Sequence, residues 1–380
     1  MSTAAARLPK AAARPALARP PAYVVLVVVV AVLNLVGVVM VLSSSSVASL
    51  TSYGSPWHFF VRHLVWTALG AIAFVVALRL DYRQWRRAVM PLLVVTIALL
   101  AAVLVPGIGI NVAGARRWLG TASWRFQPTE IAKLALLIFT ADLVARRADQ
   151  VDNWRRVLRP ALLVFSLVAA LVVLQPDLDS TVVLALVVGV VLVVGAVPWR
   201  QLAAVGVTGL VAVAGLALAA PYRRVRVFTF LDPWADASNT GYQISQSLIA
   251  LGSGGWTGVG LGAGRAKWLF LPNAHTDFIF AIIGEELGLL GCLIVVLLFV
   301  TFAVTGARTA LHAPDRFGML MAAGLTTWVV GQAAINIAAV VGLLPVSGIP
   351  LPFVSFGGTA MVMSMAAAGI LANIARQARA

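Results

Sequence analysis

Apolar runs of about 20 residues recur along the chain, each separated from the next by a short polar stretch. A helix needs about 20 such residues to cross the hydrocarbon core of a bilayer. Hydrophobic residues make up 61% of the sequence and charged residues only 11%, too few to cover the surface of a soluble domain. The sequence therefore predicts an all-α polytopic membrane protein.

About ten helices are expected to cross the membrane. They follow residues 1–21, which are rich in Ala, Pro and Arg and are expected to form a disordered cytoplasmic tail. The first apolar run is longer than that of a signal peptide, so we expect an uncleaved anchor. Residues 22–380 then form one transmembrane domain. The expected spans are 23–42, 59–78, 88–106, 128–146, 160–175, 180–197, 202–220, 277–305, 318–344 and 355–375.

The placement of basic residues predicts the orientation of these spans. Lys and Arg number 28 against 13 Asp and Glu, and most fall in the N-terminal tail and in alternate short loops such as 79–87 and 146–159. Cytoplasmic loops carry such an excess, so both termini are expected in the cytoplasm. The same placement argues against nucleic acid as the partner. Two loops, 107–127 and the long loop 221–276 before the eighth span, then face outward, and both contain arginines.

The long outer loop ends in Leu-Pro-Asn-Ala-His-Thr-Asp at 271–277, where an apolar run begins. We expect Asp277 in the first turn of that helix. One interpretation is structural, with the carboxylate facing the positive end of the helix. The other is a general base at the mouth of a cavity.

A second acidic residue opens another span, where residues 127–133 read Gln-Pro-Thr-Glu-Ile-Ala-Lys. Pro128 suits the first helical position, which places Glu130 in the first turn and Lys133 one turn deeper on the same face. The pair is either a dipole-facing glutamate with a lysine reaching the interface, or an ionisable pair that faces a substrate path. The spacing leaves both interpretations open.

Two further outer segments are interpreted first as connections. The Gln-Pro-Asp at 175–177 favours a turn between helices, because Pro and Asp are turn formers. The glycine-dense stretch 252–264 matches no nucleotide-binding fingerprint, and we expect a flexible loop that packs on the membrane surface.

Polar and proline residues also interrupt the later spans. Glu285 and Glu286 point about 100° apart on a helix, so they cannot both face one ligand, and at least one should pair with another helix. Segment 345–352 is too rich in Pro and Gly for continuous helix, and such backbone is tolerated at membrane depth where it lines a cavity. The single cysteine, Cys292, excludes an internal disulfide, and no Cys or His cluster indicates a metal.

These features together predict an outward-facing cavity with few acids and several arginines. Such a site suits an anionic, membrane-embedded substrate, since cations hold phosphates and one carboxylate handles a proton.

Several long motifs resemble the SEDS family (shape, elongation, division and sporulation), which includes FtsW and RodA. They occur in the family's order and extend from the first helix to the last. The motifs are Arg-Trp at 117–118, then 127–133, 175–178, Phe-Leu-Asp-Pro-Trp at 230–234, 241–243, 273–288 and 342–358.

The resemblance implies a ten-helix fold and a peptidoglycan glycosyltransferase that polymerises lipid II at the outer leaflet of the bacterial inner membrane. Asp277 is implied to be essential for polymerisation, with Glu130 and Lys133 lining the same cavity. Further substrate contacts are expected from Arg117, Arg226, His275, Gln175, Asp177 and Ser355.

The mechanism that the resemblance suggests is a single inverting displacement. Asp277 takes the proton from the acceptor 4-hydroxyl as that oxygen attacks the anomeric carbon of the growing strand. Undecaprenyl pyrophosphate leaves, and Lys133, Arg117 and Arg226 are the candidate cations for its charge. The resemblance implies no particular cofactor, and help from a divalent cation, Mg²⁺ or Mn²⁺, is left open.

Two residues depart from the family pattern. Asn273 stands where members often carry an acid, and Asp179 stands where glycine usually follows Gln-Pro-Asp-Leu. These departures bear on the finer substrate contacts and not on Asp277. Residues 274–288 are more similar to the division member FtsW than to RodA. The resemblance also implies other division proteins and a class B penicillin-binding protein as partners, because the chain has no transpeptidase site of its own.

Other functions compete with this one. A lipid II flippase would also use several spans and an intramembrane Glu/Lys pair, but it needs no proton-abstracting base. A non-catalytic scaffold would tolerate isosteric change of Asp277, Glu130 or Lys133. A RodA-like elongation polymerase would share the chemistry. We rank the polymerase first, the flippase second and the scaffold third.

Overall fold

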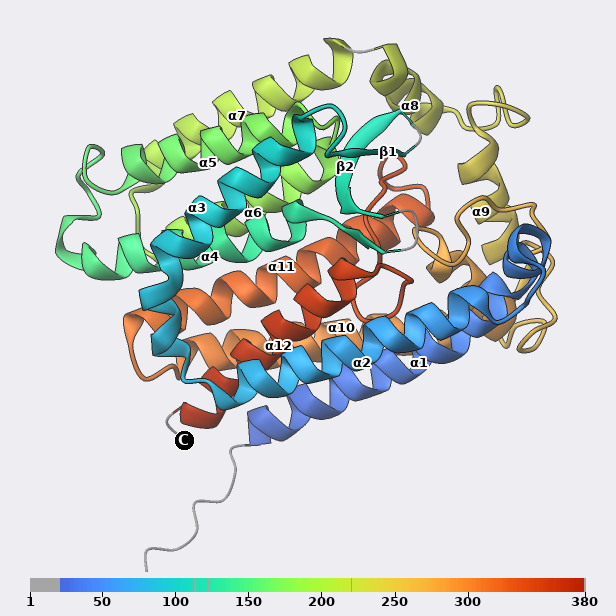
Figure 1. The fold of residues 1–380 in the computed structure, drawn as a ribbon, viewed down its shortest axis with the longest axis horizontal. Helices are drawn as coiled ribbons and strands as arrows, with labels where there is room; N and C mark the ends of the chain where they lie inside the picture. The colour runs from blue at the N-terminus through green and yellow to red at the C-terminus, as the bar shows by residue number, and fades with distance from the viewer. Residues whose placement is uncertain (1–20, 113, 122–123, 220, 379–380) are drawn as a thin grey trace, which may run out of the picture.

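The computed structural model describes residues 21–112, 114–121, 124–219 and 221–378, so the expected tail lies almost wholly outside the described residues. Long helices lie side by side in one bundle (Figure 1). The helices are α1 (Pro21–Tyr53), α2 (His58–Arg79), α3 (Trp85–Leu104), α4 (Pro128–Arg146), α5 (Leu158–Val173), α6 (Leu178–Val194), α7 (Trp199–Ala219), α8 (Pro221–Leu231), α9 (Tyr242–Ser253), α10 (Ile279–Leu311), α11 (Arg316–Val340) and α12 (Thr359–Gln377), with short 3₁₀ turns at Tyr82–Gln84 and Ala148–Gln150.

Each of the ten expected spans corresponds to a helix, namely α1 to α7 and α10 to α12. Among the described residues, seven helices are long and apolar enough to cross a membrane, and α5 and α6 are shorter apolar helices. Helix α4 carries charged residues such as Glu130, Lys133 and Asp142 and is less apolar. The chain is therefore a multi-pass membrane protein, and ten as the number of crossings stays a prediction.

Helix α1 continues to Tyr53, well beyond the expected end at residue 42. The four serines at 43–46 lie inside this helix, where a serine hydroxyl can donate to a backbone oxygen of the preceding turn. Ser46 Oγ donates to the oxygen of Ser43 at 3.1 Å, whereas the buried hydroxyls of Ser44 and Ser45 have no hydrogen-bond partner. The serine run is thus part of the packed C-terminal half of the helix.

Both loops that were expected to face outward contain regular structure that the sequence did not predict. Residues 107–127 hold β1 (Ile110–Val112), β2 (Ala115–Gly120) and β3 (Arg125–Phe126) in an antiparallel sheet of order β1-β2-β3, with Ile110 opposite Trp118 and Leu119 opposite Phe126. Such short strands show too few residues for a period-two pattern. The long loop 221–276 holds α8 and α9.

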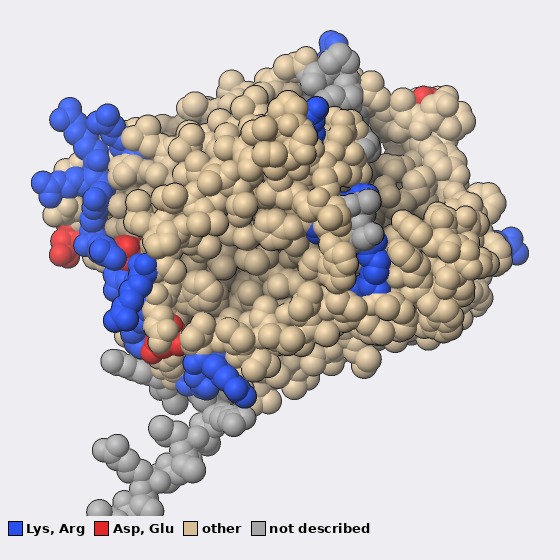
Figure 2. All heavy atoms as spheres, viewed as in Figure 1, with Lys and Arg blue, Asp and Glu red and all other residues tan. Residues whose placement is uncertain are grey.

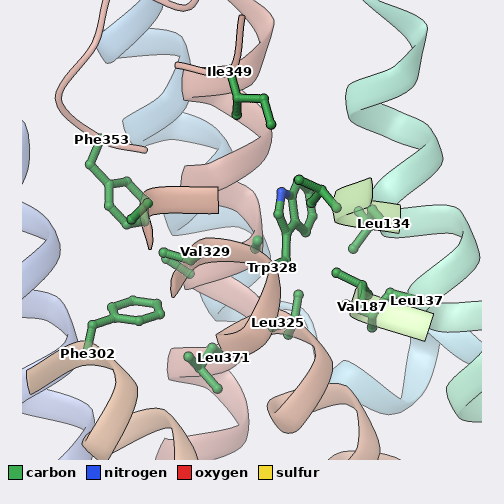
Figure 3. Packing of buried hydrophobic residues seen from close by; sticks show 14 of the residues in the cluster. Leu134, Leu137, Val187, Phe302, Leu325, Trp328, Val329, Ile349, Phe353 and Leu371 are labelled. Carbon is green, nitrogen blue, oxygen red and sulfur yellow. The ribbon is translucent and has the colours of Figure 1, made fainter. Parts of the chain in front are cut away.

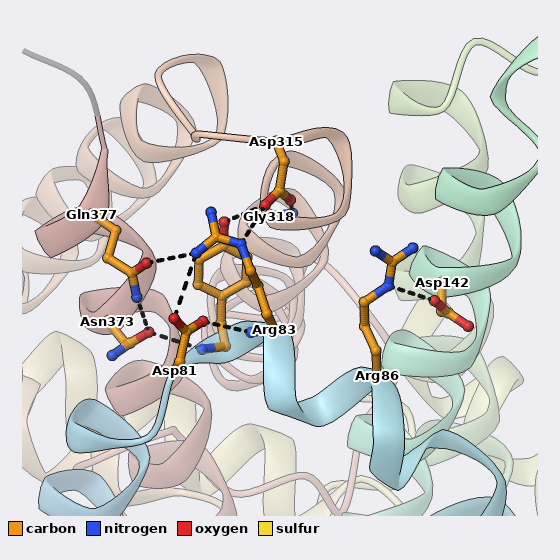
Figure 4. Close-up of polar contacts among 9 residues, drawn as sticks. Asp81, Arg83, Arg86, Asp142, Asp315, Gly318, Asn373 and Gln377 are labelled. Atoms are coloured by element: carbon orange, nitrogen blue, oxygen red, sulfur yellow. Dashed lines mark hydrogen bonds and ion pairs between the residues drawn. The ribbon is translucent and has the colours of Figure 1, made fainter.

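Basic residues gather at the end of the bundle that carries the C-terminus (Figure 2). A polar cluster there joins three connections (Figure 4). Asp315, before α11, accepts hydrogen bonds from Tyr82 Oη at 2.6 Å and Arg83 Nε at 2.9 Å, and Arg83 also donates to Gln377 of α12. Nearby, Arg86 of α3 pairs with Asp142 of α4 at 2.8 Å. These contacts fix the helix ends relative to one another.

The centre of the bundle forms around Trp328 of α11, which is fully buried. Leu134 and Leu137 of α4 and Val187 of α6 lie on one side of it, and Val329 and Phe353 lie toward the other (Figure 3). Gly324 lets α11 approach closely, because a Cβ there would lie 2.9 Å from side-chain atoms of Leu137. This packing fixes α11 against α4, the two helices that carry much of the candidate site.

Candidate active site

Glu130 and Lys133 form a buried ion pair near the N-terminal end of α4. Pro128 is the first residue of that helix and Glu130 lies in its first turn, as the sequence predicted. The Lys133 Nζ lies 2.8 Å from Glu130 Oε1, and the residues are 1% and 2% exposed. Lys133 therefore does not reach the interface, so that part of the structural interpretation was wrong.

Gln332 of α11 completes the coordination of Lys133. The Nζ donates to Gln332 Oε1 at 2.8 Å, and the Trp328 indole nitrogen donates to the same oxygen at 3.2 Å. Gln332 Nε2 in turn donates to the oxygen of Pro350 at 3.0 Å. A chain of hydrogen bonds thus links α4, α11 and the non-helical segment 341–358. This segment includes 345–352, which was expected to be non-helical, and extends beyond it at both ends.

Asp277 lies in a turn just before α10, which begins at Ile279. The expectation that it sits in the first helical turn was wrong by about two residues. Asn273 adopts a positive φ of 56°, a conformation that Asn tolerates, and its oxygen accepts from Thr276 N at 3.0 Å and Phe278 N at 3.4 Å. This local turn holds residues 273–278 out of the helix.

Asn336 connects the turn of Asp277 to the same network. Its Nδ2 donates to the backbone oxygen of Asp277 and to that of Ile349, each at 2.8 Å. Asn336 is one turn after Gln332 on α11, or ~6 Å along the helix axis. The structure therefore brings Asp277, Glu130 and Lys133 to neighbouring positions on α11, joined through two amide side chains.

Sequence reasoning missed Gln332 and Asn336. The signal was present, since two amides four residues apart share one face of an otherwise apolar span. Polar side chains inside a membrane span commonly face the interior of the bundle.

His275 packs among aromatic rings beside this site. Its ring centroid lies 4.6 Å from that of Phe59 and 5.7 Å from that of Phe356, whose N–H donates to the His275 oxygen at 3.0 Å. Burial lowers the pKa of His275 to about 4. The imidazole is therefore neutral at physiological pH.

Arg117, Gln175 and Asp177 form a separate cluster where α5 ends and α6 begins. Arg117 lies on β2. Its Nε donates to the backbone oxygen of Gln175 at 3.1 Å, and another guanidinium nitrogen donates to that of Pro176. The third nitrogen, Nη1, lies 3.9 Å from Asp177 Oδ1. Asp177 also caps α6 by accepting from Ser180 N at 3.3 Å, and it accepts from Gln127 Nε2 at 3.1 Å. The 175–177 turn is present as predicted, and it holds Arg117.

The remaining expected contacts differ in their placement. Ser355 is buried, and its Oγ accepts from Leu351 N at 2.8 Å within the non-helical segment. The side chain of Arg226 on α8 lies outside the described part of the molecule. Asp179, one of the two departures from the family pattern, accepts from Gly348 N at 3.0 Å and so contacts the same segment as Gln332 and Asn336.

A cavity of about 420 Å³ opens between α8, α9 and the end of α11. It is bordered by both apolar and polar side chains, and Asp277, Glu130 and Lys133 do not border it. The cavity is lined by Val225, Thr229, Phe230, Thr240, Gln243, Ile244, Leu344 and Val346.

The donor set near Asp277 is not that of a protein-held metal. Among the described residues, no three His, Cys, Asp or Glu side chains lie close enough to share an ion. A divalent cation would therefore need oxygen ligands from elsewhere, such as the phosphates of a substrate. Glu130 Oε2 and Asn336 Oδ1 are buried acceptors without a hydrogen-bond donor, so each could accept one further hydrogen bond inside the network.

Residues 23–380 match the FTSW_RODA_SPOVE family, described as cell cycle proteins. Over 351 residues the chain is 38% identical to a protein of Geobacter metallireducens named "probable peptidoglycan glycosyltransferase FtsW", a match that covers 92% of this chain and 93% of that one.

Two solved structures share the fold. One is described as "structural coordination of polymerization and crosslinking by a peptidoglycan synthase complex"; it has a TM-score of 0.75 and 29% identity, and the match covers 93% of this chain and 97% of that one. The other is the rod shape determining protein RodA of Thermus thermophilus, with a TM-score of 0.68 and 28% identity over 93% of this chain and 96% of that one.

Proposed function

Because the chain belongs to the FtsW, RodA and SpoVE family and is a peptidoglycan glycosyltransferase, we propose that it polymerises lipid II during septal wall synthesis, with Asp277 as the general base. The observation that carries this proposal is the link from Asp277 through Asn336 and Gln332 to the buried Glu130–Lys133 pair. An ionisable pair inside the membrane and a carboxylate at its outer mouth suit a lipid-linked anionic substrate.

In the proposed reaction, Asp277 removes the proton of the acceptor 4-hydroxyl while that oxygen attacks the anomeric carbon of the donor. The carbon–oxygen bond to undecaprenyl pyrophosphate breaks in the same step, so an α-linked donor gives a β-glycosidic bond. Asn336 fixes the backbone of Asp277, which limits the directions that the carboxylate can take. We propose that His275, whose pKa burial lowers to about 4, contacts the sugar as a neutral imidazole.

The pyrophosphate needs cationic groups as its charge develops. Lys133 and Arg117 are the described candidates, and both already have protein partners. Lys133 is 1% exposed, so it would reach the substrate only if α4 and α11 separate locally. Arg117 is held by two carbonyl oxygens and more distantly by Asp177, and its side chain is 26% exposed. Arg226 stays a proposed contact.

The membrane orientation and partners are also proposals. The gathering of basic residues at one end of the bundle supports a cytoplasmic location for that end in the bacterial inner membrane (Figure 2). The similarity to a chain of a peptidoglycan synthase complex supports a class B penicillin-binding protein as partner. Identities of 38% and 42% to FtsW-named relatives support the division role over elongation.

The test is glycan-chain formation from labelled lipid II by the purified protein with its cognate penicillin-binding protein. The wild type is compared with Asp277→Asn at matched folding, and the partner alone serves as a blank. Polymer from the wild type and none from the variant is expected.

The other outcomes separate the rival functions. Equal polymer from both proteins would remove Asp277 from the mechanism. Lipid II translocation without polymer, equal in wild type and variant, would favour a flippase. Full activity in cells after isosteric change of Asp277 would favour a scaffold.

A further inference from the structure

Helix α10 is interrupted at Gly288, close to its outer end. Gly288 has φ of 67° and ψ of −166°, which no helical residue adopts. A Cβ at this position would lie 2.4 Å from the backbone nitrogen of Gly258. The glycine-dense stretch therefore packs directly on the interruption, a contact that the expectation of a flexible surface loop did not include.

This stretch replaces the helical hydrogen bonds that the interruption removes. In a continuous helix the N–H groups of residues 289 and 290 would donate to the oxygens of residues 285 and 286. Here those oxygens accept from the N–H groups of residues 259 and 260, at 3.0 and 3.1 Å. The N–H groups of 289 and 290 instead donate to the oxygens of 255 and 256, at 2.9 and 3.2 Å. Both sides of the interruption are thus satisfied by segment 255–260.

The side chains of Glu285 and Glu286 hold the next part of the same loop. The Glu285 carboxylate accepts from the backbone N–H groups of Arg265, at 2.7 Å, and Ala266, at 3.1 Å. The Glu286 carboxylate accepts from Gly262 N at 3.1 Å. The two side chains face neighbouring parts of one loop, and both are buried.

Lys267 completes a buried triad with Glu286 and Ser43. Lys267 Nζ lies 2.9 Å from Glu286 Oε1, 3.1 Å from Ser43 Oγ and 2.6 Å from the oxygen of Gly262. Ser43 Oγ donates to Glu286 at 2.7 Å. The ammonium has three donors and each has a partner, although the side chains of Lys267 and Glu286 are only 5% and 0% exposed.

The triad joins three separate elements at one point. Ser43 belongs to α1, Lys267 to the long outer loop and Glu286 to the outer part of α10, and these elements lie together at one end of the bundle (Figure 1). Asp277 lies between Lys267 and Glu286 in the sequence. The contact between these two side chains therefore fixes both ends of the stretch 267–286 that carries Asp277.

We propose that the Lys267–Glu286–Ser43 triad is a positioning device that sets the place of Asp277 for glycosyl transfer. These residues touch neither the reacting sugar nor the pyrophosphate; they act through the backbone on both sides of Asp277. The proposal rests on the proposed function of Asp277, and it assigns to the Glu-Glu pair of α10 a role distinct from acid–base chemistry.

The test is a double-mutant cycle with Lys267→Met, Glu286→Gln and both together, in the full chain with its partner protein. Each single change leaves the other member of the buried ion pair without its charged partner. The double change removes both charges, so no unpaired charge stays buried. We expect each single variant to lower kcat about tenfold or more with KM within about threefold, and the double variant to recover most of the loss. The matched control is Arg265→Met, which removes an exposed cation two residues away and keeps the backbone N–H that Glu285 binds.

Hydrogen exchange supplies a readout independent of activity. Amides of 255–260 and 276–279 should exchange faster in both single variants than in the wild type and Arg265→Met. Ser43→Ala removes the hydrogen bond to Glu286 and the one from Lys267 but leaves both charges paired. It should produce a smaller change in the same amides if a charge variant fails to fold.

Unchanged exchange in Lys267→Met and Ser43→Ala would overturn the proposal, as would a double variant that loses activity by the product of the single losses. A wild type without polymerase activity would contradict the function of Asp277, and the exchange data would then still decide whether the triad fixes its turn.

Discussion

Asn336 Nδ2 lies 2.8 Å from the backbone oxygen of Asp277, which ties the turn before α10 to the interior of α11. The same nitrogen donates to Ile349, and one helical turn earlier Gln332 contacts both Lys133 and Pro350. Helix α11 is therefore the common support of the acidic turn, the buried ion pair and the proline-rich segment. Its amides link groups that are far apart in the sequence.

The first prediction concerns this support. Asn336→Leu keeps a similar side-chain volume but leaves the oxygens of Asp277 and Ile349 without their donor. A hydrogen bond contributes about 0.5–1.5 kcal/mol, so the loss of two should lower kcat roughly five- to hundredfold. Steady-state polymerisation of lipid II measures this.

Asn34→Leu is the matched control, because the Asn34 amide is also buried but donates to Val30 of its own helix. An equal loss of kcat in both variants would show a general effect of removing a buried amide and would contradict the assigned role of Asn336.

The sequence was sufficient for the geometry of α4 and insufficient for its partners. Pro128 and the three-residue spacing predicted the first turn and the shared face of Glu130 and Lys133, because both depend on local helical geometry. Gln332 lies 199 positions from Lys133, and no local pattern encodes which helices will be neighbours. The helices that correspond to the ten expected spans were predictable because they depend on local hydropathy. The tertiary contacts were not, because they depend on which helices become neighbours.

Local turn geometry explains the other differences. The turn of Asp277 departs from the helix because Asn273 adopts a positive φ, which a hydropathy pattern does not indicate. The glycines of 252–264 predicted flexibility, yet one of them contacts the interruption of α10 so closely that no side chain fits. Glycine allows both a flexible loop and a close backbone approach, and only the fold distinguishes them.

The second prediction concerns the buried pair of α4. Glu130→Gln leaves the Lys133 ammonium without a counterion, and breaking a buried pair costs about 3–5 kcal/mol of stability. Glu130→Gln with Lys133→Met removes both charges and should restore much of the thermal stability while leaving activity low. Thermal unfolding and polymerisation, measured on the same samples, separate the two effects. Full activity in the double variant would exclude a role for either charge in catalysis.

The third prediction concerns Asp179, where the family pattern has glycine. Its carboxylate accepts from Gly348 N at 3.0 Å near the surface, so the contact should be modest in free energy. Asp179→Gly should raise the exchange rate of the Gly348 amide and lower kcat/KM about two- to fivefold. Asp179→Asn keeps an acceptor oxygen and should resemble the wild type. A Gly348 amide that exchanges equally in all three proteins would show that this hydrogen bond does not restrain the segment.

The fourth prediction concerns stability against pH at the basic end of the bundle. Burial raises the pKa of Asp315, but hydrogen bonds from Tyr82, Gly318 and Arg83 outweigh burial, so the pKa lies below its usual 3.8. A carboxyl whose folded pKa is lowered stabilises the fold above its unfolded pKa, and this contribution is lost as pH falls through the folded pKa. Wild type should therefore unfold at a higher temperature than Asp315→Asn near neutral pH, with the difference shrinking below about pH 4.

The control for this measurement is Asp149→Asn, since Asp149 is an exposed acid in the connection between α4 and α5, at the same end of the bundle (Figure 1). Its unfolding temperature should follow that of the wild type across the pH range. If the difference between wild type and Asp315→Asn stayed constant from neutral to acidic pH, the contribution of Asp315 would come from packing or hydrogen bonding that does not depend on its charge. If the difference in unfolding temperature instead disappears as the pH falls, the ionised carboxylate of Asp315 is what joins the turn at 81–83 to α11.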